Sequence, residues 1–512
     1  MIELLDTTLR DGEQTAGVSF NASEKLTIAK LLLDDVHVDR IEVASARVSS
    51  GELDAFGRIC SWAKKNGHLQ QVEALGFVDN GVSIDWIANA GGRVINLLTK
   101  GSLRHVTSQL KKTPEEHIDD IRHNIKLAQA RGLEVNIYLE DWSNGMINSP
   151  EYVYQMLDSL AAEPICRFML PDTLGILTPD LTLKFCTDIV SRYPHLRFDF
   201  HAHNDYDMAV ANVYSAVKAG IQGIHTTVNG LGERAGNAPL ASVVGILNDH
   251  LRITNTLNEG RLTHICKIVE SISGVRIPDN KPLVGDSVFT QCAGIHADGD
   301  NKDNLYCNEL VPERFGRVRK YALGKTSGKA NIAKNLEELG IHLTSEQVKL
   351  VTQRVIELGD KKENLSTEDL PFIIADVLKS SSVNHDAIRI VNYCLNLTLG
   401  LKPVATLRIS IDGTEHEESS RGDGQYDAFM KALWKIYDKL GREHPTLADY
   451  NVSIPPGGKT DALVETVITW NWNGTTLRTR GLDVDQTEAA IKATMKMLNI
   501  ISNSSIYTTN NQ

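Results

Sequence analysis

The sequence predicts an α/β protein in which a closed (β/α)8 barrel is followed by a small helical linker region and a C-terminal α+β domain. Strand-like apolar runs alternate with amphipathic helical stretches at intervals of roughly thirty residues over the first half of the chain, and parallel strands require such helical crossovers. There are eight of these units, the number that closes a barrel. An open doubly wound sheet is the alternative, but it seldom uses eight such regular units.

Each barrel strand is predicted from a short run rich in Val, Ile, Leu and Phe. The helix starts between them agree with this pattern. Asn21–Glu24 has the form of a capping box before a helix over Lys25–Leu33, and Thr113–Glu116 places proline and acids in a first turn. The eight predicted strands are Glu3–Asp6, Arg40–Ala44, Val72–Phe77, Val94–Leu98, Val135–Glu140, Arg167–Pro171, Arg197–His201 and Gly223–Val228.

The composition of the chain changes after the predicted barrel. Residues of about 280–335 are rich in Gly, Asp, Asn and Lys, and a helical stretch of about 330–380 follows. We therefore expect a TIM-barrel domain over 1–280, linker subdomains over 281–388 and a C-terminal domain over 389–512.

The C-terminal domain is expected to contain two similar βα halves. A Gly-rich turn at Gly422–Gly424 separates a strand from the first helix, and it is predicted to be a tight turn rather than a phosphate site. The strands are expected at Ala405–Ile411 and Ala462–Trp470, and the helices near Gln425–Leu440 and Asp485–Leu498.

Composition narrows the classes of function. The 512 residues carry a net charge of −12 without a long run of Lys or Arg, which argues against nucleic-acid binding. No apolar run approaches the length of a membrane span, and no signal-peptide pattern precedes the first predicted strand. The 7 cysteines are scattered and lack Cys-x-x-Cys spacing, as expected for reduced thiols. We expect a cytoplasmic protein that binds neither membrane nor nucleic acid.

Two motifs at predicted strand ends carry the strongest chemical signal. Asp6–Gln14 (DTTLRDGEQ) follows the first strand, and His201–Asp205 (HAHND) ends the seventh. Side chains alternate along a strand, so His201 and His203 lie on the same side. With the carboxylate of Asp11 they form an N,N,O set that suits a divalent metal ion. A lone His-x-His is more often coincidental, but polar residues at other strand ends favour a metal site here.

Further polar residues lie at the C-terminal ends of the predicted strands, which together form one rim of the barrel. The loops after the strands form the active site in this fold. Glu140 ends the fifth predicted strand, Thr173 follows the sixth, and Asn237 lies in the loop after the eighth. The candidate functional residues therefore converge on one end of the barrel.

The motifs resemble those of the 2-isopropylmalate, homocitrate and citramalate synthase family, whose members are metal-dependent barrel enzymes that condense acetyl-CoA with a 2-oxo acid. The resemblance covers essentially the whole chain, and the motifs follow the family's order. The citramalate branch is the more similar one, in Asn96–Leu103 and His296–Lys302. The motifs that carry the resemblance are Leu5–Gln14, His201–Asp205, Asn229–Asn237 and His296–Asp300.

The resemblance implies a divalent metal site. Asp11, His201 and His203 match the family's ligands, and Asn237 matches a further ligand or a close neighbour. Mixed carboxylate, imidazole and amide ligands leave positions open where a 2-oxo acid could chelate. Magnesium, manganese and zinc are all compatible with this set.

The resemblance also implies three catalytic or substrate-binding side chains on the rim. Arg10 matches an arginine that points at the ketone oxygen, where a fixed cation would stabilise a developing alkoxide. Glu140 matches a carboxylate beside it, which would take part in an acid/base relay or orient Arg10. Thr173 would bind the substrate carboxylate.

A base must remove a proton from the methyl group of acetyl-CoA, whose acidity is low. His296 matches the histidine that the family delivers from a neighbouring subunit, so a domain-exchanged homodimer is implied, with residues 281–388 completing the acetyl-CoA site. The matching acetyl-CoA contacts are Asp298, Asn304, Leu305 and Tyr306.

The identity of the 2-oxo acid is expected to depend on Leu75, Leu98 and Tyr138, which match the family's side-chain pocket. Two leucines and a tyrosine make a crowded apolar pocket, which favours the methyl group of pyruvate and formation of (R)-citramalate. The alternative is 2-oxoisovalerate, the substrate of 2-isopropylmalate synthase. Homocitrate synthesis is less favoured, because a second carboxylate would need a basic pocket residue, and none is identified in the sequence.

The C-terminal domain resembles the family's amino-acid-sensing domain, which implies feedback by isoleucine or leucine. Val484 stands where the family pattern leads us to expect proline, and the competing interpretation is that this domain only dimerises. The implied effector-binding residues are Tyr426, Leu447, Tyr450, Ile454, Val464 and Gln486.

Two other classes of protein compete with this interpretation. A hydroxyacyl-CoA lyase of the same superfamily would share Asp11, His201 and His203. It would lack the long C-terminal domain and would carry a reactive cysteine after the eighth strand, which Asn229–Asn237 does not supply. A non-catalytic effector-binding protein would not need the complete metal rim.

Overall fold

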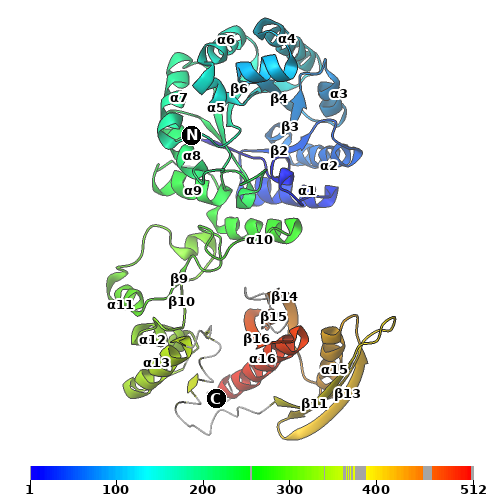
Figure 1. The fold of residues 1–512 in the computed structure, drawn as a ribbon, viewed down its shortest axis with the longest axis vertical. Coiled ribbons are helices and arrows are strands. Elements are labelled where there is room, and N and C mark those ends of the chain that lie inside the picture. Colours follow the sequence, from blue (N-terminus) through cyan, green and yellow to red (C-terminus); the bar gives the residue numbers. More distant parts are fainter. Residues whose placement is uncertain are drawn as a thin grey trace. The chain divides into compact units, whose positions relative to one another are not determined.

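The protein is seen in a computed structural model that describes residues 2–253, 256–339, 341–360, 388–453 and 464–508, with isolated positions between 365 and 377. Two compact units divide the chain (Figure 1). One consists of Met1–Thr290 with Cys307–Lys320, and the other of Gln291–Tyr306 with Tyr321–Gln512.

The first unit contains a closed barrel of strands β1 to β8, in which β8 pairs back to β1 and every pair is parallel (Figure 1). The predicted (β/α)8 barrel is therefore confirmed. β4 and β6 extend past their predicted ends because polar residues such as Lys100 continue the ladder, opposite Glu140 of β5. The strands are β1 Glu3–Asp6, β2 Arg40–Ser45, β3 Val72–Phe77, β4 Val94–Lys100, β5 Glu134–Glu140, β6 Ile165–Asp172, β7 Phe198–Ala202 and β8 Gly223–Thr226.

Helices connect these strands around the outside of the barrel. Both predicted capping boxes are present, with Asn21 capping α1 and Thr113 capping α4. The helix predicted over Lys25–Leu33 is α-helical only to Lys30, and a π-helical turn over Leu31–Val36 continues it. The helices are α1 Ala22–Lys30, α2 Ser50–Asn66, α3 Val82–Asn89, α4 Pro114–Ala130, α5 Trp142–Asn148, α6 Pro150–Leu160, α7 Pro179–Arg192, α8 Ala209–Lys218, α9 Leu240–Asp249 and α10 Leu262–Ser273.

Charged residues occupy the barrel at the N-terminal ends of its strands. Arg40 of β2 pairs with Glu73 at 3.0 Å and with Asp199 at 2.5 Å, and all three side chains are buried. Arg167 pairs with Glu3 at 2.6 Å. The first residue of β8 is Gly223, where an added Cβ would lie 2.0 Å from Asp199 Oδ1. The charged groups therefore fill this end of the barrel tightly, and the apolar core lies between the strands and the helices.

A group of short elements follows the barrel, and its two short strands span the boundary between the two units. Apolar residues that include Ile332, Leu336, Val351 and Val355 pack together between two of its helices. The elements are the short strands β9 Thr290–Gln291 and β10 Lys320–Tyr321, and the helices α11 Gly294–Asp303, α12 Lys329–Glu338 and α13 Ser345–Asp360.

Two halves of matching architecture form the rest of the second unit. Each is a three-stranded antiparallel sheet followed by a helix, so the predicted βα halves are βββα in the structure. Leu407 and Leu433 of the first half and Trp470 and Met497 of the second belong to one apolar cluster. The elements are β11 Ile388–Asn396, β12 Val404–Ile411, β13 Thr414–Arg421, α15 Gln425–Lys439, β14 Thr446–Ser453, β15 Val464–Trp472, β16 Thr475–Asp483 and α16 Gln486–Thr508.

Among the described residues, no helix has the length and apolar character needed to cross a bilayer.

Candidate functional site

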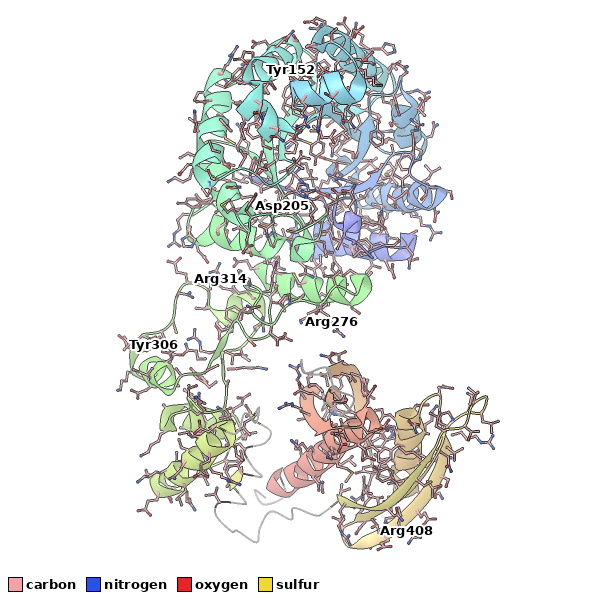
Figure 2. The ribbon with its side chains drawn as sticks, viewed as in Figure 1. Tyr152, Asp205, Arg276, Tyr306, Arg314 and Arg408 are labelled. Carbon is pink, nitrogen blue, oxygen red and sulfur yellow. The ribbon has the colours of Figure 1, made fainter. Side chains whose placement is uncertain are left out.

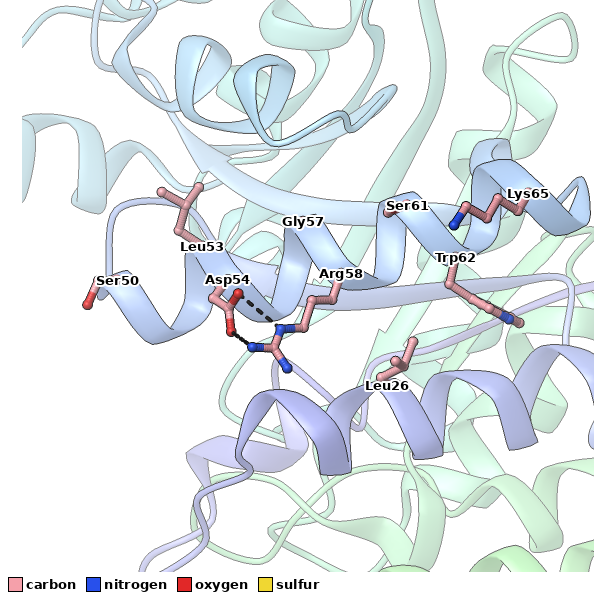
Figure 3. Close-up of a pocket in the computed structure, with 9 residues that line it drawn as sticks. All are labelled: Leu26, Ser50, Leu53, Asp54, Gly57, Arg58, Ser61, Trp62 and Lys65. Carbon is pink, nitrogen blue, oxygen red and sulfur yellow. Dashed lines mark hydrogen bonds and ion pairs between the residues drawn. The ribbon is translucent and has the colours of Figure 1, made fainter.

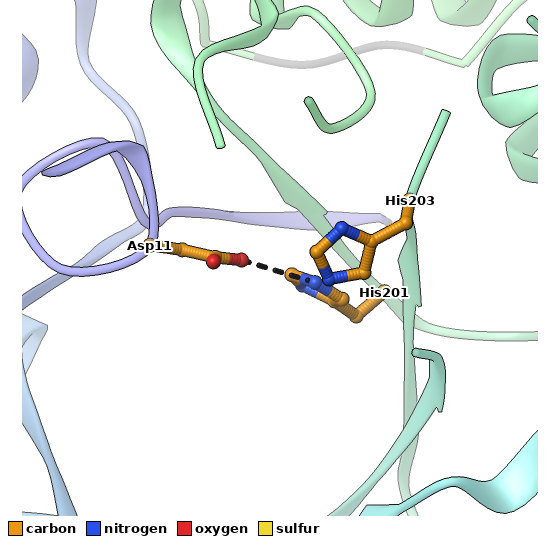
Figure 4. A group of neighbouring side chains, drawn as sticks. All are labelled: Asp11, His201 and His203. Carbon is orange, nitrogen blue, oxygen red and sulfur yellow. Dashed lines mark ion pairs between the residues drawn. The ribbon is translucent and has the colours of Figure 1, made fainter. Parts of the chain in front are cut away.

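Three predicted ligands meet at the C-terminal rim of the barrel. Asp11 follows β1, His201 lies in β7 and His203 comes just after it, and one ligand atom of each lies within 4.8 Å of the others (Figure 4). His201 Nε2 is 3.2 Å from Asp11 Oδ2. All three residues are buried. The structure thus brings together the N,N,O set predicted from the two motifs.

Buried polar atoms without hydrogen-bond partners surround this cluster, as expected of a site that holds a cation. The Nδ1 atoms of His201 and His203 and the Oδ1 atom of Asn237 are buried without a hydrogen-bond partner. Asn237 donates from Nδ2 to Asp11 Oδ2 at 3.1 Å and to the Leu231 carbonyl at 3.0 Å, which leaves Oδ1 available. One carboxylate, two imidazoles and an amide oxygen form a donor set that divalent metals accept.

The protonation states of the cluster also favour a cation. Burial, followed by the neighbouring His201, lowers the pKa of His203 to about 4, so its imidazole is neutral and able to act as a ligand near pH 7. Burial alone would raise the pKa of Asp11, but Arg10 and the histidines outweigh burial and hold that pKa below its ordinary range. The site therefore presents an ionised carboxylate and a neutral imidazole.

A buried lysine fixes the turn that carries Arg10 and Asp11. Lys25 of α1 donates from Nζ to the Leu9 carbonyl at 2.9 Å, and it pairs with Glu13 at 2.7 Å and Glu52 at 2.5 Å. Its side chain has no exposed surface. Sequence reasoning missed Lys25, although a lysine among the buried positions of an amphipathic helix is a signal worth following.

Arg10 is oriented by Glu42, which sequence reasoning also missed. The guanidinium donates to Glu42 Oε2 at 2.5 Å, and Glu42 Oε1 accepts from Asn96 Nδ2 at 2.7 Å. Burial alone would lower the pKa of Arg10, but Glu42 and then Asp11 outweigh burial and raise it, so Arg10 stays charged. A glutamate inside the apolar run of β2 was the available signal.

Glu140 lies at the predicted strand end, and its ion-pair partner is a lysine rather than Arg10. It ends β5 and forms an ion pair with Lys100, its neighbour at the end of β4. The role of orienting Arg10 therefore belongs to Glu42, because the Arg10 guanidinium is directed to β2 rather than to β5. A direct catalytic role for Glu140 stays a prediction, and Lys100 is a neighbour that sequence reasoning missed.

Thr173 follows β6 and is half-buried. Its Oγ1 accepts a hydrogen bond from the Asp141 backbone N at 2.9 Å, so its hydroxyl proton can be donated elsewhere. Asp141 has a φ of 65°, a strained conformation for a non-glycine residue. The predicted interaction of Thr173 with a substrate carboxylate is compatible with this geometry.

The three predicted pocket residues share one small apolar cluster inside the barrel. Leu75 and Tyr138 are buried in it together with Leu5 and Met169, and Leu98 packs against it. The Tyr138 ring lies edge-on to that of His201, with centroids 6.3 Å apart. Leu5 and Met169 were not singled out from the sequence, since the choice of inward-facing positions depends on the register of each strand.

The predicted acetyl-CoA residues lie in the second unit, on α11 and at its C-terminal end. The His296 and Tyr306 rings have centroids 4.2 Å apart, and an added Cβ at Gly299 would lie 2.4 Å from the Tyr306 ring. Asp298 pairs with Lys302 at 2.7 Å on the same helix. The other two predicted contacts are the exposed residues Asn304 and Leu305. The structure gathers this group, but in a different unit from Asp11.

The predicted effector residues are only partly brought together. The rings of Tyr426 and Tyr450 have centroids 5.5 Å apart, and the Tyr426 hydroxyl lies 2.7 Å from Thr494 Oγ1. Gln486 hydrogen-bonds Tyr450 from the start of α16. The remaining predictions are Leu447, which is exposed on β14, Val464, which is buried at the start of β15, and Ile454, which lies outside the described residues. The exposed Val484 follows β16.

Two hollows on the barrel unit differ in their relation to this site. A cavity of about 460 Å³ is lined by Arg10, Glu13 and Glu52 and so opens beside the rim cluster. A larger groove of about 690 Å³ runs between α1 and α2 on the outside of the barrel, where Arg58 pairs with Asp54 next to Trp62 (Figure 3). The outer groove contains none of the candidate functional residues.

Comparison with known proteins gives matches along nearly the whole chain. An HMGL-like family model matches residues 1–269, a homocitrate synthase post-HMGL domain-like model matches 283–363, and a LeuA allosteric (dimerisation) domain model matches 364–502. A Methanopyrus kandleri protein named as an (R)-citramalate synthase is 35% identical, with 90% of this chain and 88% of the relative covered.

Two further relatives carry both names that the motifs suggested. A second Methanopyrus kandleri protein, named as a 2-isopropylmalate synthase, is 33% identical, with 97% of this chain and 98% of the relative covered. The (R)-citramalate synthase of Methanocaldococcus jannaschii is 32% identical, with 98% of this chain and 100% of the relative covered. These matches confirm the resemblance drawn from the motifs, and the chain belongs to the HMGL-like family, among relatives that include (R)-citramalate and 2-isopropylmalate synthases.

Proposed function

We propose that this protein condenses acetyl-CoA with a 2-oxo acid, and that its preferred 2-oxo acid is pyruvate. A bond forms between the acetyl methyl carbon and the ketone carbon, the methyl group loses a proton, and water cleaves the thioester to release CoA and (R)-citramalate. The observation that supports this reaction is the position of Arg10 beside the Asp11, His201 and His203 cluster, at the rim where this fold carries its chemistry.

The rim residues would bind and polarise the 2-oxo acid. A divalent cation, whether magnesium, manganese or zinc, held by Asp11, His201 and His203 would supply Lewis-acid polarisation of the ketone. Arg10, which Glu42 holds in place, would donate to the oxygen that gains negative charge as the new bond forms. The free hydroxyl proton of Thr173 would be donated to the substrate carboxylate.

A homodimer would complete the site. His296 belongs to the second unit, and we propose that it removes the methyl proton of acetyl-CoA bound to another copy of the chain. Tyr306 would hold the His296 ring through their ring contact. The match of residues 364–502 to a dimerisation domain supports the dimer. Glu140, which forms an ion pair with Lys100, would then accept this proton from His296.

The apolar cluster below the rim supports pyruvate as the substrate. Leu75, Leu98 and Tyr138 crowd the place where a 2-oxo acid side chain would lie. Crowding excludes a bulky group strongly, whereas an absent methylene costs only about 1–3 kcal/mol. The second candidate is 2-oxoisovalerate, because relatives named as 2-isopropylmalate synthases are nearly as similar as those named as citramalate synthases.

The C-terminal domain would adjust this activity in branched-chain amino-acid biosynthesis. It matches an allosteric (dimerisation) domain, and Tyr426 and Tyr450 form an aromatic pair that could pack against an isoleucine or leucine side chain. Replacing Tyr450 with Ala should weaken inhibition by either amino acid and leave the uninhibited rate unchanged. Inhibition that persists unchanged in this variant, with both amino acids tested, would count against the assignment.

The reaction is tested by the release of free CoA, measured with a thiol reagent. Purified protein is given acetyl-CoA and, in separate assays, pyruvate, 2-oxoisovalerate or 2-oxoglutarate, each with and without a chelator. We expect chelator-sensitive CoA release that is fastest with pyruvate. Fastest release with 2-oxoisovalerate would assign the second candidate, and no release with any 2-oxo acid would refute the condensation.

A further inference from the structure

A line of buried hydrogen-bonded groups runs down the barrel interior from Arg10. Arg10 Nη2 lies 3.4 Å from the Tyr138 hydroxyl, which lies 2.9 Å from His225 Nδ1. His225 Nε2 is 3.3 Å from Asp199 Oδ2. The side chains of His225 and Asp199 have essentially no exposed surface. His225 and Asp199 belong to none of the motifs and do not reach the rim, so neither takes part in the chemistry proposed above.

The charges around Asp199, at the end of this line farthest from the rim, fix the direction of these hydrogen bonds. Asp199 receives a hydrogen bond from Arg40 at 2.5 Å and lies 3.6 Å from Arg167, so it is an ionised carboxylate that can only accept. His225 must therefore donate from Nε2. In a neutral imidazole the other nitrogen is then an acceptor, and Tyr138 has to donate its hydroxyl proton to Nδ1.

The contact with Arg10 at the rim end of this line favours the same direction. Arg10 has donors only, so the Tyr138 oxygen must accept from it. With its proton directed to His225, the Tyr138 oxygen offers a lone pair to Arg10. With the opposite histidine tautomer, Nδ1 would donate to the Tyr138 oxygen, and the hydroxyl proton would turn toward Arg10. A donor would then face a donor beside the ketone site.

We propose that Asp199 and His225 are positioning residues that set the direction of the Tyr138 hydroxyl, so that Tyr138 and Glu42 together hold Arg10. This inference rests on the proposed function for its catalytic consequence. It adds two residues to the groups that govern the rate, and both come from the closed end of the barrel, which is the end at the N-termini of the strands where Arg40, Glu73 and Asp199 lie. It also gives Tyr138 a second role besides lining the substrate pocket.

The most direct test inverts the tautomer. In Asp199→Asn the amide can donate to His225 Nε2, which forces the proton onto Nδ1, as the corresponding change does in serine proteases. We expect kcat/KM for CoA release with the preferred 2-oxo acid to fall about 10- to 100-fold, the usual cost of losing an outer orienting partner. The variant also weakens the pairs with Arg40 and Arg167, so its Tm is measured alongside.

A double-mutant cycle separates positioning from stability. In the Tyr138→Phe background there is no hydroxyl left to misdirect, so adding Asp199→Asn should change kcat/KM by less than about threefold, while the Tm falls in both backgrounds alike. Equal losses of kcat/KM in both backgrounds would overturn the proposal. So would an unchanged kcat/KM in Asp199→Asn alone.

A second pair of variants covers the case in which Asp199→Asn does not fold. His225→Asn can keep an acceptor near the position of Nδ1, whereas His225→Leu removes it. We expect His225→Asn to retain more activity than His225→Leu. Equal activity of the two variants contradicts the proposal.

Nitrogen-15 NMR of the full-length, histidine-labelled protein tests the hydrogen-bond direction without any activity measurement. The wild type is expected to show His225 protonated at Nε2, and a signal from the Nδ1-protonated form would overturn the inference. If no 2-oxo acid supports CoA release, the proposed function fails and the catalytic consequence with it. The NMR result still decides how Tyr138 is directed.

Discussion

The two ends of the barrel interior both contain buried charges, but they are balanced differently. At the N-terminal end, the buried Arg40 and Arg167 and the half-exposed Arg197 face Glu3, Glu73 and Asp199. At the C-terminal rim, a single guanidinium, that of Arg10, faces both Glu42 and Asp11. Figure 2 shows the side chains of the described residues on the ribbon.

This difference separates residues that stabilise the fold from residues that serve the reaction. Opposite charges that match in number fix the barrel strands relative to one another, because removing either partner of a buried pair leaves a costly unpaired charge. The rim has a surplus carboxylate and buried acceptor atoms without partners on His201, His203 and Asn237. A cation beside Asp11 would balance the surplus carboxylate, so changes at the rim should cost activity. Changes at the N-terminal end should cost stability and, at Asp199, activity as well.

The largest expected effect is on stability at the closed end. Arg40→Ala leaves Glu73 and Asp199 without their main partner, and we expect the free energy of unfolding to fall by about 3–5 kcal/mol. Chemical denaturation measures it. The matched control is Arg58→Ala on α2, which removes an exposed pair with Asp54 and should cost less than about 1 kcal/mol. Equal losses in the two variants would contradict the structural role of the closed end.

The next effect is on activity at the rim. His203→Ala removes one of the three candidate metal ligands, and we expect CoA release to fall by about 10³-fold, a typical loss for a group that supports transition-state charge. The free energy of unfolding measured without added metal should change little. In thermal melts, a divalent cation should raise the Tm of the wild type but not of the variant. A variant with wild-type activity would remove His203 from the site.

A smaller loss is expected from Arg10→Lys, which keeps the charge but not the forked geometry that Glu42 and Tyr138 hold. We expect kcat to fall about 10²-fold with a lesser change in the KM for the 2-oxo acid. Glu42→Gln, which keeps an acceptor for Arg10, should lower kcat less. If Glu140→Gln instead reproduced the Arg10→Lys loss and Glu42→Gln did not, Glu140 rather than Glu42 would govern Arg10.

The smallest effect concerns the choice of substrate. Leu98→Ala enlarges the apolar cluster, and it should raise kcat/KM for 2-oxoisovalerate relative to pyruvate about tenfold, close to the worth of one or two methylene contacts. Steady-state assays with both acids measure the ratio. A ratio that stays fixed would place the specificity pocket elsewhere.

The sequence predicted the barrel well and the second unit less well, for a physical reason. Parallel barrel strands are buried on both faces, so runs such as Val135–Glu140 are mostly apolar rather than alternating. The antiparallel strand β13, Thr414–Arg421, is almost entirely polar because only its Ser420 is buried, and it was missed together with β11, β14 and β16. Hairpin pairing rather than burial holds such a strand.

The candidate site was predicted where a motif carries the residues and missed where partners come from distant strands. Asp11, His201 and His203 lie in short motifs at strand ends. Glu42 and Lys25 have no motif, and their importance follows from the partners that the barrel brings to them across other strands and helices. Sequence spacing does not contain that information, because it depends on the closure and register of the barrel.

Direct binding of a divalent cation tests whether the rim is built around one. Electron paramagnetic resonance of the full-length protein titrated with Mn²⁺ should show one bound ion per chain, with binding lost in His203→Ala and retained in Arg58→Ala. Addition of pyruvate should change the spectrum of the bound ion. No bound Mn²⁺ in the wild type, or binding that His203→Ala leaves unchanged, would contradict the account.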